Sequence, residues 1–361
     1  MKNLVIKTIS IMTLIFGLFS CSNDGNNDEI QKYPTMYEIV SADANFSILK
    51  LAIEKTSPSG DSNSILNRLR GVGSFTVFAP TNAAFIAAGF PEATVQALNP
   101  TSTVAADVAA ISALRRVLQY HILSIGTLSN DLLAAEYSKT FASGVVTSAT
   151  NGTLSLFVNQ NGTDILVNGG AANNGAKVTT ANVNASNGVI HVIDGVLKLP
   201  TIVDFVKCNP KLSTLLSIVT STSTGAYGDQ STVLTAISVP ATTTPANART
   251  LYAPTNTAFA TATTGAGFLT GTAVTPANVT KVLQYHVESA NRLTITAGTS
   301  FSSSDVTVAT LLTPQTFLLP KNLLLIKETA TTNTASNILN FNIQATNGVI
   351  HTVNRVLQPT L

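Results

Sequence analysis

Four histidines are the residues in this sequence best suited to acid–base or metal chemistry near neutral pH. They are His121, His191, His286 and His351. A metal site needs such residues at ligand spacing, and the sequence has no His-x-His, His-Glu-x-x-His or Cys-x-x-Cys motif. A Ser/His/Asp triad is recognised by geometry rather than by sequence order, but the Gly-x-Ser-x-Gly elbow that can carry its serine is absent. The residues therefore predict no metal site, no cofactor and no enzyme, with a hydrolase as the remotest reading.

Two other segments look chemically reactive but are better explained as structure. Gly170 to Lys177 echoes a phosphate-binding loop, yet the lysine does not directly follow the second glycine and no Ser or Thr follows the lysine. We expect a turn between short strands there. Cys208 lies in an apolar segment near the start of the second half, where we expect a buried thiol rather than a reactive one.

The histidines lie in segments with the periodicity of regular structure. Leu114, Val117, Leu118 and His121 fall at i, i+3, i+4 and i+7, and Val279, Val282, Leu283 and His286 repeat this pattern. Each of these histidines is therefore predicted to end the apolar stripe of a helix, and Thr275-Pro276 supplies a cap and a first-turn proline for the second one. A histidine on an apolar stripe is more often a hydrogen-bonded core residue than a contact residue.

The other two histidines follow Asn-Gly dipeptides. Asn187-Gly188 predicts a hairpin turn, and the alternation after it places Val189, His191 and Ile193 on one face of a strand. Further strands are predicted at 74–78, 154–158, 165–167 and 178–183. A short helix capped by Thr81 or Asn82 should run to about residue 88, with Gly89 at its carboxyl end. The fold class is therefore α+β.

The sequence contains an internal repeat of three blocks in the same order. The paired blocks are Phe78-Ala-Pro-Thr-Asn-Ala-Ala-Phe85 with Tyr252-Ala-Pro-Thr-Asn-Thr-Ala-Phe259, Val117-Leu-Gln-Tyr-His121 with Val282-Leu-Gln-Tyr-His286, and Asn187-Gly-Val-Ile-His191 with Asn347-Gly-Val-Ile-His351. The boundary between the copies falls near Pro200, which predicts domains at 34–200 and 201–361. Almost no linker remains, so we expect the two domains to touch.

The amino terminus has the features of an exported, lipid-anchored protein. Lys2 and Lys7 precede the apolar run 9–19, which is too short to span a bilayer but fits a signal peptide over residues 1–20. The run ends in Leu18-Phe19-Ser20-Cys21, which looks like the lipobox of bacterial lipoproteins. We expect lipidation of Cys21, followed by a polar, acidic tether over 21–33. Acids just after the cysteine resemble the export signal of surface lipoproteins of the Bacteroidetes, so we favour the outer face of the outer membrane over its periplasmic face.

The composition narrows the classes of partner. Only 11% of residues are charged, against roughly 25% in a typical soluble protein. The formal net charge is +2, which provides no field to gather phosphates, so nucleic-acid binding is disfavoured. Surfaces rich in hydroxyls and amides suit wet, polar contacts with proteins or glycans.

The three blocks, in this order and spacing, resemble the fasciclin (FAS1) domain. Both copies match and together cover about residues 34 to 361. The resemblance implies a compact β-sheet wedge or sandwich flanked by helices, in tandem, used by extracellular and surface proteins for adhesion and matrix contact. It does not imply an enzyme.

The resemblance also implies candidate adhesion residues. Animal members carry a Tyr-His motif linked to integrin-dependent adhesion, and it matches Tyr120-His121 and Tyr285-His286. Those members also use an Asp-Ile pair just before the Asn-Gly turn. This chain has Asn182-Val183 and Asn342-Ile343 there, which argues against integrin-type binding.

The leading hypothesis is therefore a surface lipoprotein whose two domains bind an extracellular or cell-envelope protein or glycan and touch the membrane only through the lipid anchor. The alternative is a lipoprotein that holds an apolar or glycan ligand between its domains, because domain interfaces are common ligand sites.

Overall fold

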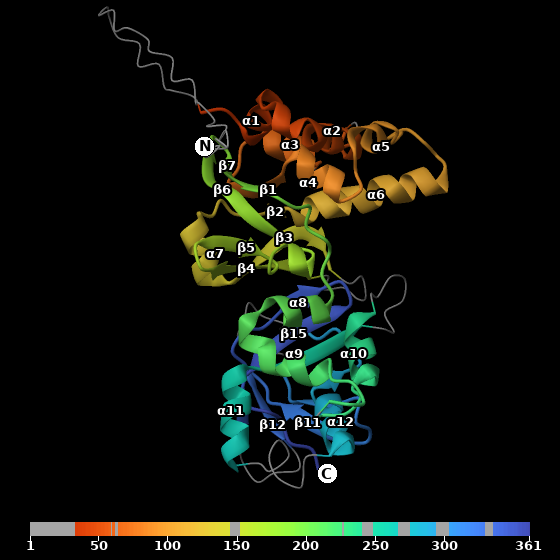
Figure 1. The fold of residues 1–361 in the computed structure, drawn as a ribbon, viewed down its shortest axis with the longest axis vertical. Coiled ribbons are helices and arrows are strands. Elements are labelled where there is room, and N and C mark those ends of the chain that lie inside the picture. Colours follow the sequence, from red (N-terminus) through yellow and green to blue (C-terminus); the bar gives the residue numbers. More distant parts are fainter. Residues whose placement is uncertain are drawn as a thin grey trace, which may run out of the picture. The chain divides into compact units, whose positions relative to one another are not determined.

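The computed structural model describes residues 33–58, 60–61, 64–144, 152–225, 227–239, 248–265, 275–293, 303–328 and 335–361 (Figure 1). The expected signal peptide, Cys21 and most of the tether fall outside these described residues. Within them, no helix is long and apolar enough to cross a membrane.

The first repeat contains both helices and strands. Its helices are α1 Met36–Ala42, η1 Ala44–Phe46, α2 Ser47–Thr56, α3 Ile65–Arg70, α4 Asn82–Ala87, α5 Glu92–Gln96, α6 Ala105–Tyr120, α7 Ser129–Ala135 and η2 Ala171–Asn173. Its strands are β1 Phe75–Pro80, β2 Ile122–Leu123, β3 Tyr137–Ser143, β4 Thr153–Asn161, β5 Asp164–Val167, β6 Ala176–Ala185 and β7 Gly188–Ile193.

The second repeat follows a similar order. Its helices are α8 Ile202–Cys208, η3 Pro210–Leu212, α9 Ser213–Val219, α10 Ser231–Ser238, α11 Asn256–Gly265 and α12 Pro276–Tyr285. Its strands are β8 Arg249–Pro254, β9 Val287–Glu288, β10 Val306–Ala309, β11 Thr316–Leu319, β12 Leu325–Glu328, β13 Ala335–Asn337, β14 Ile343–Ala345 and β15 Gly348–Val353. The α+β class expected from the sequence is confirmed.

The strands of the first repeat form a closed barrel in the order β1-β2-β3-β4-β5-β6-β7. Neighbouring strands are antiparallel except β7 and β1, which pair in parallel over the full length of both strands, from Phe75 opposite Gly188 to Pro80 opposite Ile193. Closure removes the unpaired strand edges that an open sheet would expose.

The second repeat has the same strand order but is held together differently. Its strands form two 4-stranded sheets, β14-β15-β8-β9 and β10-β11-β12-β13. Isolated bridges join the sheets, one between Glu288 and Thr310 and one between Ile338 and Val353. The second copy thus keeps the strand order of the first, but its described strands pair as two sheets connected by these bridges.

The Phe-Ala-Pro-Thr-Asn block folds as a strand followed by a capped helix. Strand β1 ends at Pro80, and the Thr81 side chain caps α4 by accepting from the N–H of Ala84. The Asn82 amide then reaches α2, accepting from the N–H of Ile48 at 3.0 Å and donating to the carbonyl of Ala44 at 2.8 Å. Asn256 makes the matching bonds to Thr214 and Pro210 in the second copy. The block therefore ties the sheet to the helical layer.

The Asn-Gly hairpin is present, but its turn lies one residue earlier than the sequence analysis expected. Ala185 pairs with Gly188, so the turn residues are Ser186 and Asn187. Gly188 belongs to the strand with a φ of +143°, and a Cβ there would lie 1.9 Å from the carbonyl oxygen of Phe75. The glycine is required by the close approach of β1 rather than by the turn.

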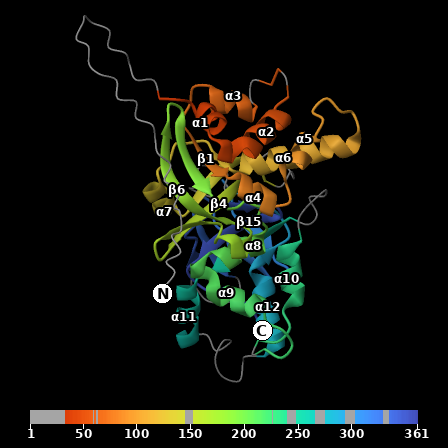
Figure 2. The ribbon, with the colours of Figure 1, turned by 45° about the horizontal axis from the view of Figure 1, so that its top comes forward.

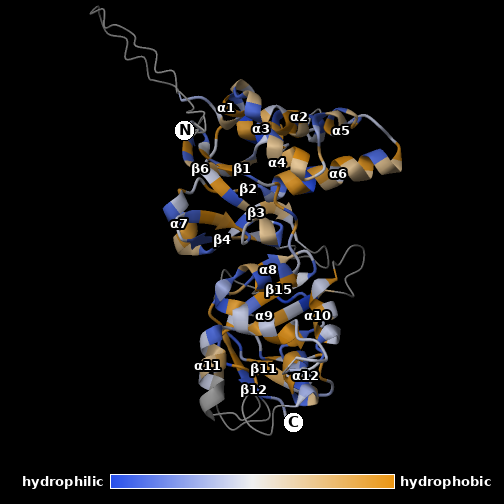
Figure 3. Ribbon diagram, in the orientation of Figure 1, coloured by the Kyte–Doolittle hydropathy of each residue, from blue (hydrophilic) through white to orange (hydrophobic). Residues whose placement is uncertain are grey.

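The core of the first repeat lies on both faces of β1 and β7. Val77 and Ile190 pack with helices α1 to α6, which Figure 2 shows gathered beside β1. Phe78 and Ile193 point to the other side and pack inside the barrel. Both faces of β7 are therefore covered, whereas the sequence alternation singled out one. Figure 3 shows hydrophobic residues running along the strands and mixed with hydrophilic ones on the helices.

Candidate functional site

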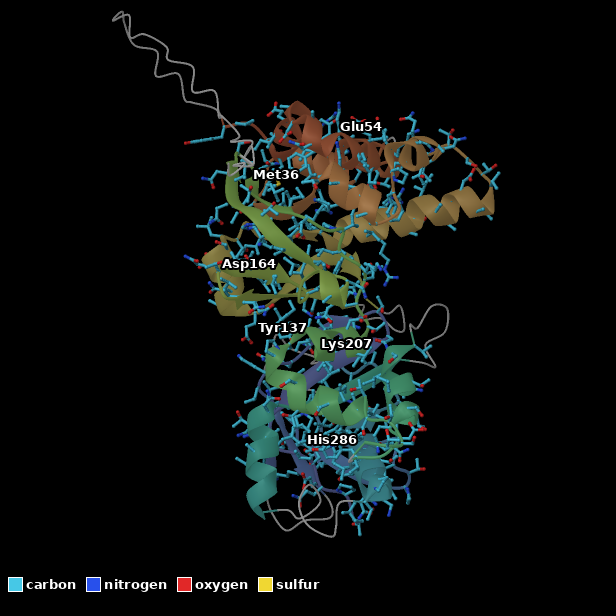
Figure 4. The ribbon with its side chains drawn as sticks, viewed as in Figure 1. Met36, Glu54, Tyr137, Asp164, Lys207 and His286 are labelled. Atoms are coloured by element: carbon cyan, nitrogen blue, oxygen red, sulfur yellow. The ribbon has the colours of Figure 1, made fainter. Side chains whose placement is uncertain are left out.

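The four candidate adhesion residues lie inside the two cores. Tyr120 and Tyr285 are fully buried, and His121 and His286 are each 2% exposed. Figure 4 labels His286 within the second repeat. In this fold none of the four side chains is available to a partner at the surface, so their roles follow from the groups that they contact internally.

His121 and His286 each join the end of a helix to the last segment of their own repeat. His121 lies directly after α6, with its Nδ1 2.8 Å from the carbonyl oxygen of Val117, and its Nε2 accepts from the N–H of Leu197 at 2.9 Å. His286 makes the same contacts with Val282 at 2.7 Å and Leu357 at 2.8 Å. A carbonyl can only accept and an N–H can only donate, so both imidazoles are neutral with the proton on Nδ1.

The strand histidines join different segments with the opposite tautomer. The Nδ1 of His191 accepts from the N–H of Asn182 at 3.3 Å, and its Nε2 lies 3.0 Å from the carbonyl oxygen of Thr127. His351 has equivalent contacts with Asn342 at 3.2 Å and Arg292 at 2.8 Å. These two rings carry their proton on Nε2 and link three strand or loop segments of each repeat.

Burial keeps these imidazoles neutral at ordinary pH. Desolvation lowers the pKa of His121, His286 and His351 from 6.5 to about 4, and it also lowers the pKa of His191. A general base must instead titrate near the working pH and reach a substrate proton. The histidines have neither the pKa nor the exposure that such a role requires.

The tyrosines next to these histidines are also used internally. The Tyr120 hydroxyl donates to the carbonyl of Ser155 at 2.8 Å and accepts from the amide of Asn168 at 2.8 Å. The Tyr285 hydroxyl donates to the carbonyl of Thr316 at 2.8 Å. Burial raises the pKa of Tyr120 well above its usual value, so the phenol remains a neutral donor.

Asn182 and Asn342 lie at positions with unusual backbone geometry. Asn182 has a φ of +61° and Asn342 a φ of +57°, in the left-handed region that asparagine tolerates better than most residues. The Asn182 amide also accepts from the N–H of Ser129 at 2.9 Å and donates to its hydroxyl at 3.0 Å. The residue therefore anchors helix α7 and presents its N–H to His191.

Other groups that could take part in chemistry also have structural roles. Among the described residues, no group of three or more His, Cys, Asp or Glu side chains could hold a metal ion. The Asp194 carboxylate accepts from the N–H of Lys177, and the Asn354 amide makes the matching bond to Asn337 in the second copy. Burial raises the pKa of the Cys208 thiol, which makes it less reactive.

Sequence reasoning missed a pair of asparagines that organise each repeat. Asn187 is buried, its Oδ1 accepts from the N–H of Met36 at 2.9 Å, and its Nδ2 donates to the carbonyls of Leu69 at 2.9 Å and Gly71 at 3.0 Å. Asn347 binds Ile202 and Ile237 in the same way. The signal was present in the repeat, because both Asn-Gly blocks keep the asparagine, but the dipeptide also has an ordinary explanation as a turn.

The two repeats meet along strand β4 of the first and strand β14 of the second. The Ser155 hydroxyl accepts from the N–H of Gln344 at 3.0 Å. The ammonium group of Lys139 donates to Ser155 Oγ at 3.0 Å and to the carbonyl of Asn342. Desolvation of that ammonium lowers the pKa of Lys139 from 10.5 to about 8. Direct hydrogen bonds thus connect the two repeats at this junction.

An aromatic cluster completes this junction. Tyr137 and Phe157 pack with their ring centroids 4.9 Å apart, and Phe205 from α8 lies 5.9 Å from Tyr137. The Tyr137 hydroxyl accepts from the amide of Asn209 at 2.8 Å, and Glu136 forms an ion pair with Lys211. Phe157 belongs to the core of the second repeat, so the expectation that the domains touch is met by shared packing.

The described residues line cavities of very different size. A cavity of about 100 Å³ lies at the junction and is lined by Asn168, Asn173, Asn174, Lys198, Leu199, Pro200, Asp204, Phe205 and Cys208. A more open hollow of about 500 Å³ on the second repeat is lined by Pro210, Lys211, Thr255, Asn256, Thr257, Leu339 and Asn354. The apolar spaces beside His121 and His286 measure about 10 Å³ each.

The sequence is similar to a known domain family and to known proteins over parts of its length. The fasciclin domain model matches residues 46–200 and 222–359. Mouse Stabilin-1 is 32% identical over 134 residues, which are 37% of this chain and 4% of Stabilin-1. The chain thus spans only a small part of that relative's length. Protein sll1483 of Synechocystis is 32% identical over 166 residues, which are 46% of this chain and 74% of that protein.

A solved FAS1 domain pair from the insect cell adhesion molecule Fasciclin I covers 90% of this chain at 15% sequence identity, with a TM-score of 0.43. The family match rests on the two segments of the domain model, which fall on the two copies of the repeat. This chain is therefore a member of the fasciclin domain family, with two fasciclin domains in tandem.

Proposed function

We propose that this chain is a surface-anchored adhesion lipoprotein. After export, a lipid on Cys21 holds it in the outer membrane, and its two fasciclin domains face outward and bind a protein or glycan of a neighbouring cell or matrix. Membership of the fasciclin domain family, which the match of the domain model to both repeats shows, supports this class of function.

One observation carries the proposal: the four histidines and the tyrosines Tyr120 and Tyr285 are buried and hydrogen-bonded inside the fold. Each histidine binds two of the protein's own backbone groups, and Tyr120 and Tyr285 bind carbonyls. A binding role needs no such group, because contact surfaces depend on shape and on exposed hydrogen-bonding groups.

The hollow on the second domain offers a surface for such a contact. Its volume of about 500 Å³ is open to the surface, and it combines hydroxyl and amide side chains with the half-exposed Leu339. Thr257 is exposed at its rim, and Lys211 provides a cation that Glu136 balances. This mixture suits a neutral polar partner such as a glycan or an uncharged protein loop, bound partly through water.

The alternative function, a small-molecule carrier, has the junction cavity as its support. Asn173, Lys198 and Asp204 offer that cavity polar groups able to bind a hydroxylated ligand. Its volume of about 100 Å³ is below the roughly 300–1,000 Å³ of ordinary ligand pockets. The apolar spaces of about 10 Å³ beside the helical histidines hold no more than a water-sized group. Adhesion is therefore the function that we place first.

A cell-attachment assay tests the adhesion proposal. Cells that carry the anchor with residues 34–361 deleted should attach to matrix or to other cells less than cells with the intact chain. Leu339→Asp should reproduce part of that loss, whereas Ile86→Asp, a change at a similarly exposed position of the first domain, should not. Attachment that is unchanged by the deletion on every surface tested contradicts adhesion.

The anchoring and display need a separate test. Metabolic labelling with a fatty acid should mark the intact chain and fail to mark Cys21→Ser. Protease treatment of intact cells should digest both domains. Full protection of a labelled chain would move the domains to the periplasmic side and exclude adhesion between cells.

A further inference from the structure

Four segments meet at one end of the first domain, which we call the hairpin end: 33–34, 71–74, 125–128 and the turn 186–188. Ser186 donates to the carbonyl of Pro34 at 2.9 Å, and Gly126 donates to the hydroxyl of Ser74 at 3.1 Å. The Asn187 amide holds the carbonyl of Gly71 at 3.0 Å. The segments are therefore fixed next to one another by hydrogen bonds.

The equivalent end of the second domain is covered by the first domain. The Thr346 N–H donates to the carbonyl of Pro200 at 2.8 Å, matching Ser186 and Pro34. Pro200 and Thr346 are buried, whereas Pro34 and Ser186 are exposed. Ser155 and Lys139 of the first domain contact Gln344 and Asn342 beside this turn. The same surface is thus an interdomain interface in the second repeat and is exposed to solvent in the first repeat.

The open copy carries large apolar side chains that protrude into solvent. Val72, between two glycines, is 99% exposed, Ile125 is 62% exposed and Tyr33 is 60% exposed. Thr76 donates to the carbonyl of Ile125, and Thr250 makes the same bond to the carbonyl of Ala290, so Ile125 and Ala290 occupy equivalent positions. The open end therefore has a large apolar residue where the covered end has a small one. Single exposed apolar residues are ordinary on a protein surface, but these three lie on adjoining loops at one end of the domain.

A second copy of the chain does not fit this surface well. The face that covers the second domain uses Tyr137, Lys139 and Phe157. Tyr120 binds the carbonyl of Ser155 and Tyr285 that of Thr316, so these two positions are equivalent. The strand registers then give Thr307, Ala309 and Leu318 as the equivalents of Tyr137, Lys139 and Phe157. The lysine and both aromatic rings are missing there, so head-to-tail stacking of copies would lack the contacts that hold the two domains together.

We propose that the hairpin end of the first domain rests on the lipid bilayer, with Val72, Ile125 and Tyr33 inserted at the level of the headgroups. The proposal rests on the lipid anchor at Cys21. The tether ends at Tyr33, on this surface, and the 12 peptide units from Cys21 reach at most about 40 Å when fully extended. An anchored chain therefore keeps this end close to the membrane, where tyrosine and exposed aliphatic side chains partition favourably.

Tryptophan fluorescence tests the contact directly, because the sequence contains no tryptophan. The lipidated full chain carrying Val72→Trp or Ile125→Trp is reconstituted into phosphatidylcholine vesicles whose acyl chains are brominated. Ile86→Trp, on α4 away from the hairpin end and 58% exposed, is the matched control. We expect a blue shift and strong quenching for the first two variants and neither for the control.

The outcomes separate this proposal from the proposed anchoring. A chain that floats with the vesicles but whose Val72→Trp and Ile125→Trp variants are quenched no more than Ile86→Trp overturns the contact and leaves the anchor in place. A chain that does not float overturns both. A dimer in detergent that Val72→Asp with Ile125→Asp dissociates would assign the surface to a second copy and also overturn the proposal.

Discussion

The Ser155 hydroxyl of strand β4 accepts a hydrogen bond at 3.0 Å from the backbone N–H of Gln344, a residue 189 positions further along the chain in strand β14. Ser155 and Gln344 are both buried. The bond therefore joins the two fasciclin domains in a place that water does not reach, and losing it leaves a buried N–H without its acceptor. Cys208 lies at the same junction, where its Cβ packs against Gly169 of the first domain.

Ser155→Ala should loosen the junction between the domains. The change removes the acceptor of Gln344 and a partner of Lys139, and an unsatisfied buried N–H costs about 1–3 kcal/mol. Opening of the junction would expose the Cys208 thiol, so in a Cys21→Ser background we expect faster reaction with a maleimide. Thr316→Ala, at the equivalent position of the second domain, is the control and should leave Cys208 protected. Equal labelling rates for Ser155→Ala and the parent chain would contradict this reading.

Acid should unfold the protein through its histidines. Desolvation lowers the pKa of His121, His286 and His351 from 6.5 to about 4, so the unfolded chain binds more protons than the folded one between those values. The stability is fully present above pH 6.5 and is lost as the pH falls toward 4, by about 3 kcal/mol for each histidine. Urea unfolding at a series of pH values measures this loss.

Nuclear magnetic resonance of the imidazoles checks the cause. In the folded protein the ring signals of His121, His286 and His351 should stay in the neutral form from pH 8 down to about pH 5. Titration of any of these three rings near pH 6.5, or a free energy of unfolding that is the same at pH 7 and pH 4.5, would rule out this account.

Local patterns predicted the elements well. The apolar stripes that end at His121 and His286 predicted α6 and α12, and Thr275-Pro276 marked the start of α12. Thr81 caps α4, as the sequence indicated. These features depend on residues a few positions apart, which fix the helix face and the cap before any tertiary contact forms.

Long-range features were beyond the reach of such patterns. Closure of the barrel depends on β1 pairing with β7, more than a hundred residues away in sequence. The hairpin turn was placed one residue late, because the glycine of Asn187-Gly188 is required by contact with Phe75 and not by the turn. The Asn187 side chain binds segments 116 to 151 residues away, which no local spacing encodes.

Asn187→Asp should destabilise the first domain strongly. The aspartate keeps an oxygen that can accept from the N–H of Met36, but it loses the two N–H groups of the amide. A buried carboxylate oxygen then faces the carbonyl oxygens of Leu69 and Gly71. We expect a loss of about 3 kcal/mol or more, because a buried polar group left unpaired costs more when it is charged. Asn184→Asp, on the exposed face of the same hairpin, should change the free energy of unfolding by less than about 0.5 kcal/mol. Similar urea midpoints for the two variants would refute the role of Asn187.

The second domain contains a buried ionic cluster that the first domain lacks. Arg292 donates from Nε to both carboxylate oxygens of Glu288 at 2.9 Å, and the Tyr252 hydroxyl donates to Glu288 at 3.1 Å. The equivalent residues of the first domain are Phe78, Leu123 and Thr127, as the matching strand pairs and histidine contacts establish. The repeat therefore offers an apolar version of the same site within the same chain.

The apolar residues at the equivalent positions of the first domain lead to opposite predictions for the stability of a single and of a triple variant of the second domain. Glu288→Leu alone leaves the partly buried guanidinium without its carboxylate and should cost about 3–5 kcal/mol. Adding Arg292→Thr and Tyr252→Phe recreates the first domain's residues, removes the cost of desolvating two charges, and keeps the ring that packs against Phe317. The triple variant should be as stable as the parent chain or more stable in urea unfolding. The first domain tolerates Phe78, Leu123 and Thr127 at the equivalent positions. A triple variant as unstable as Glu288→Leu would therefore mean that the residues around this site in the second domain have adapted to the charged pair.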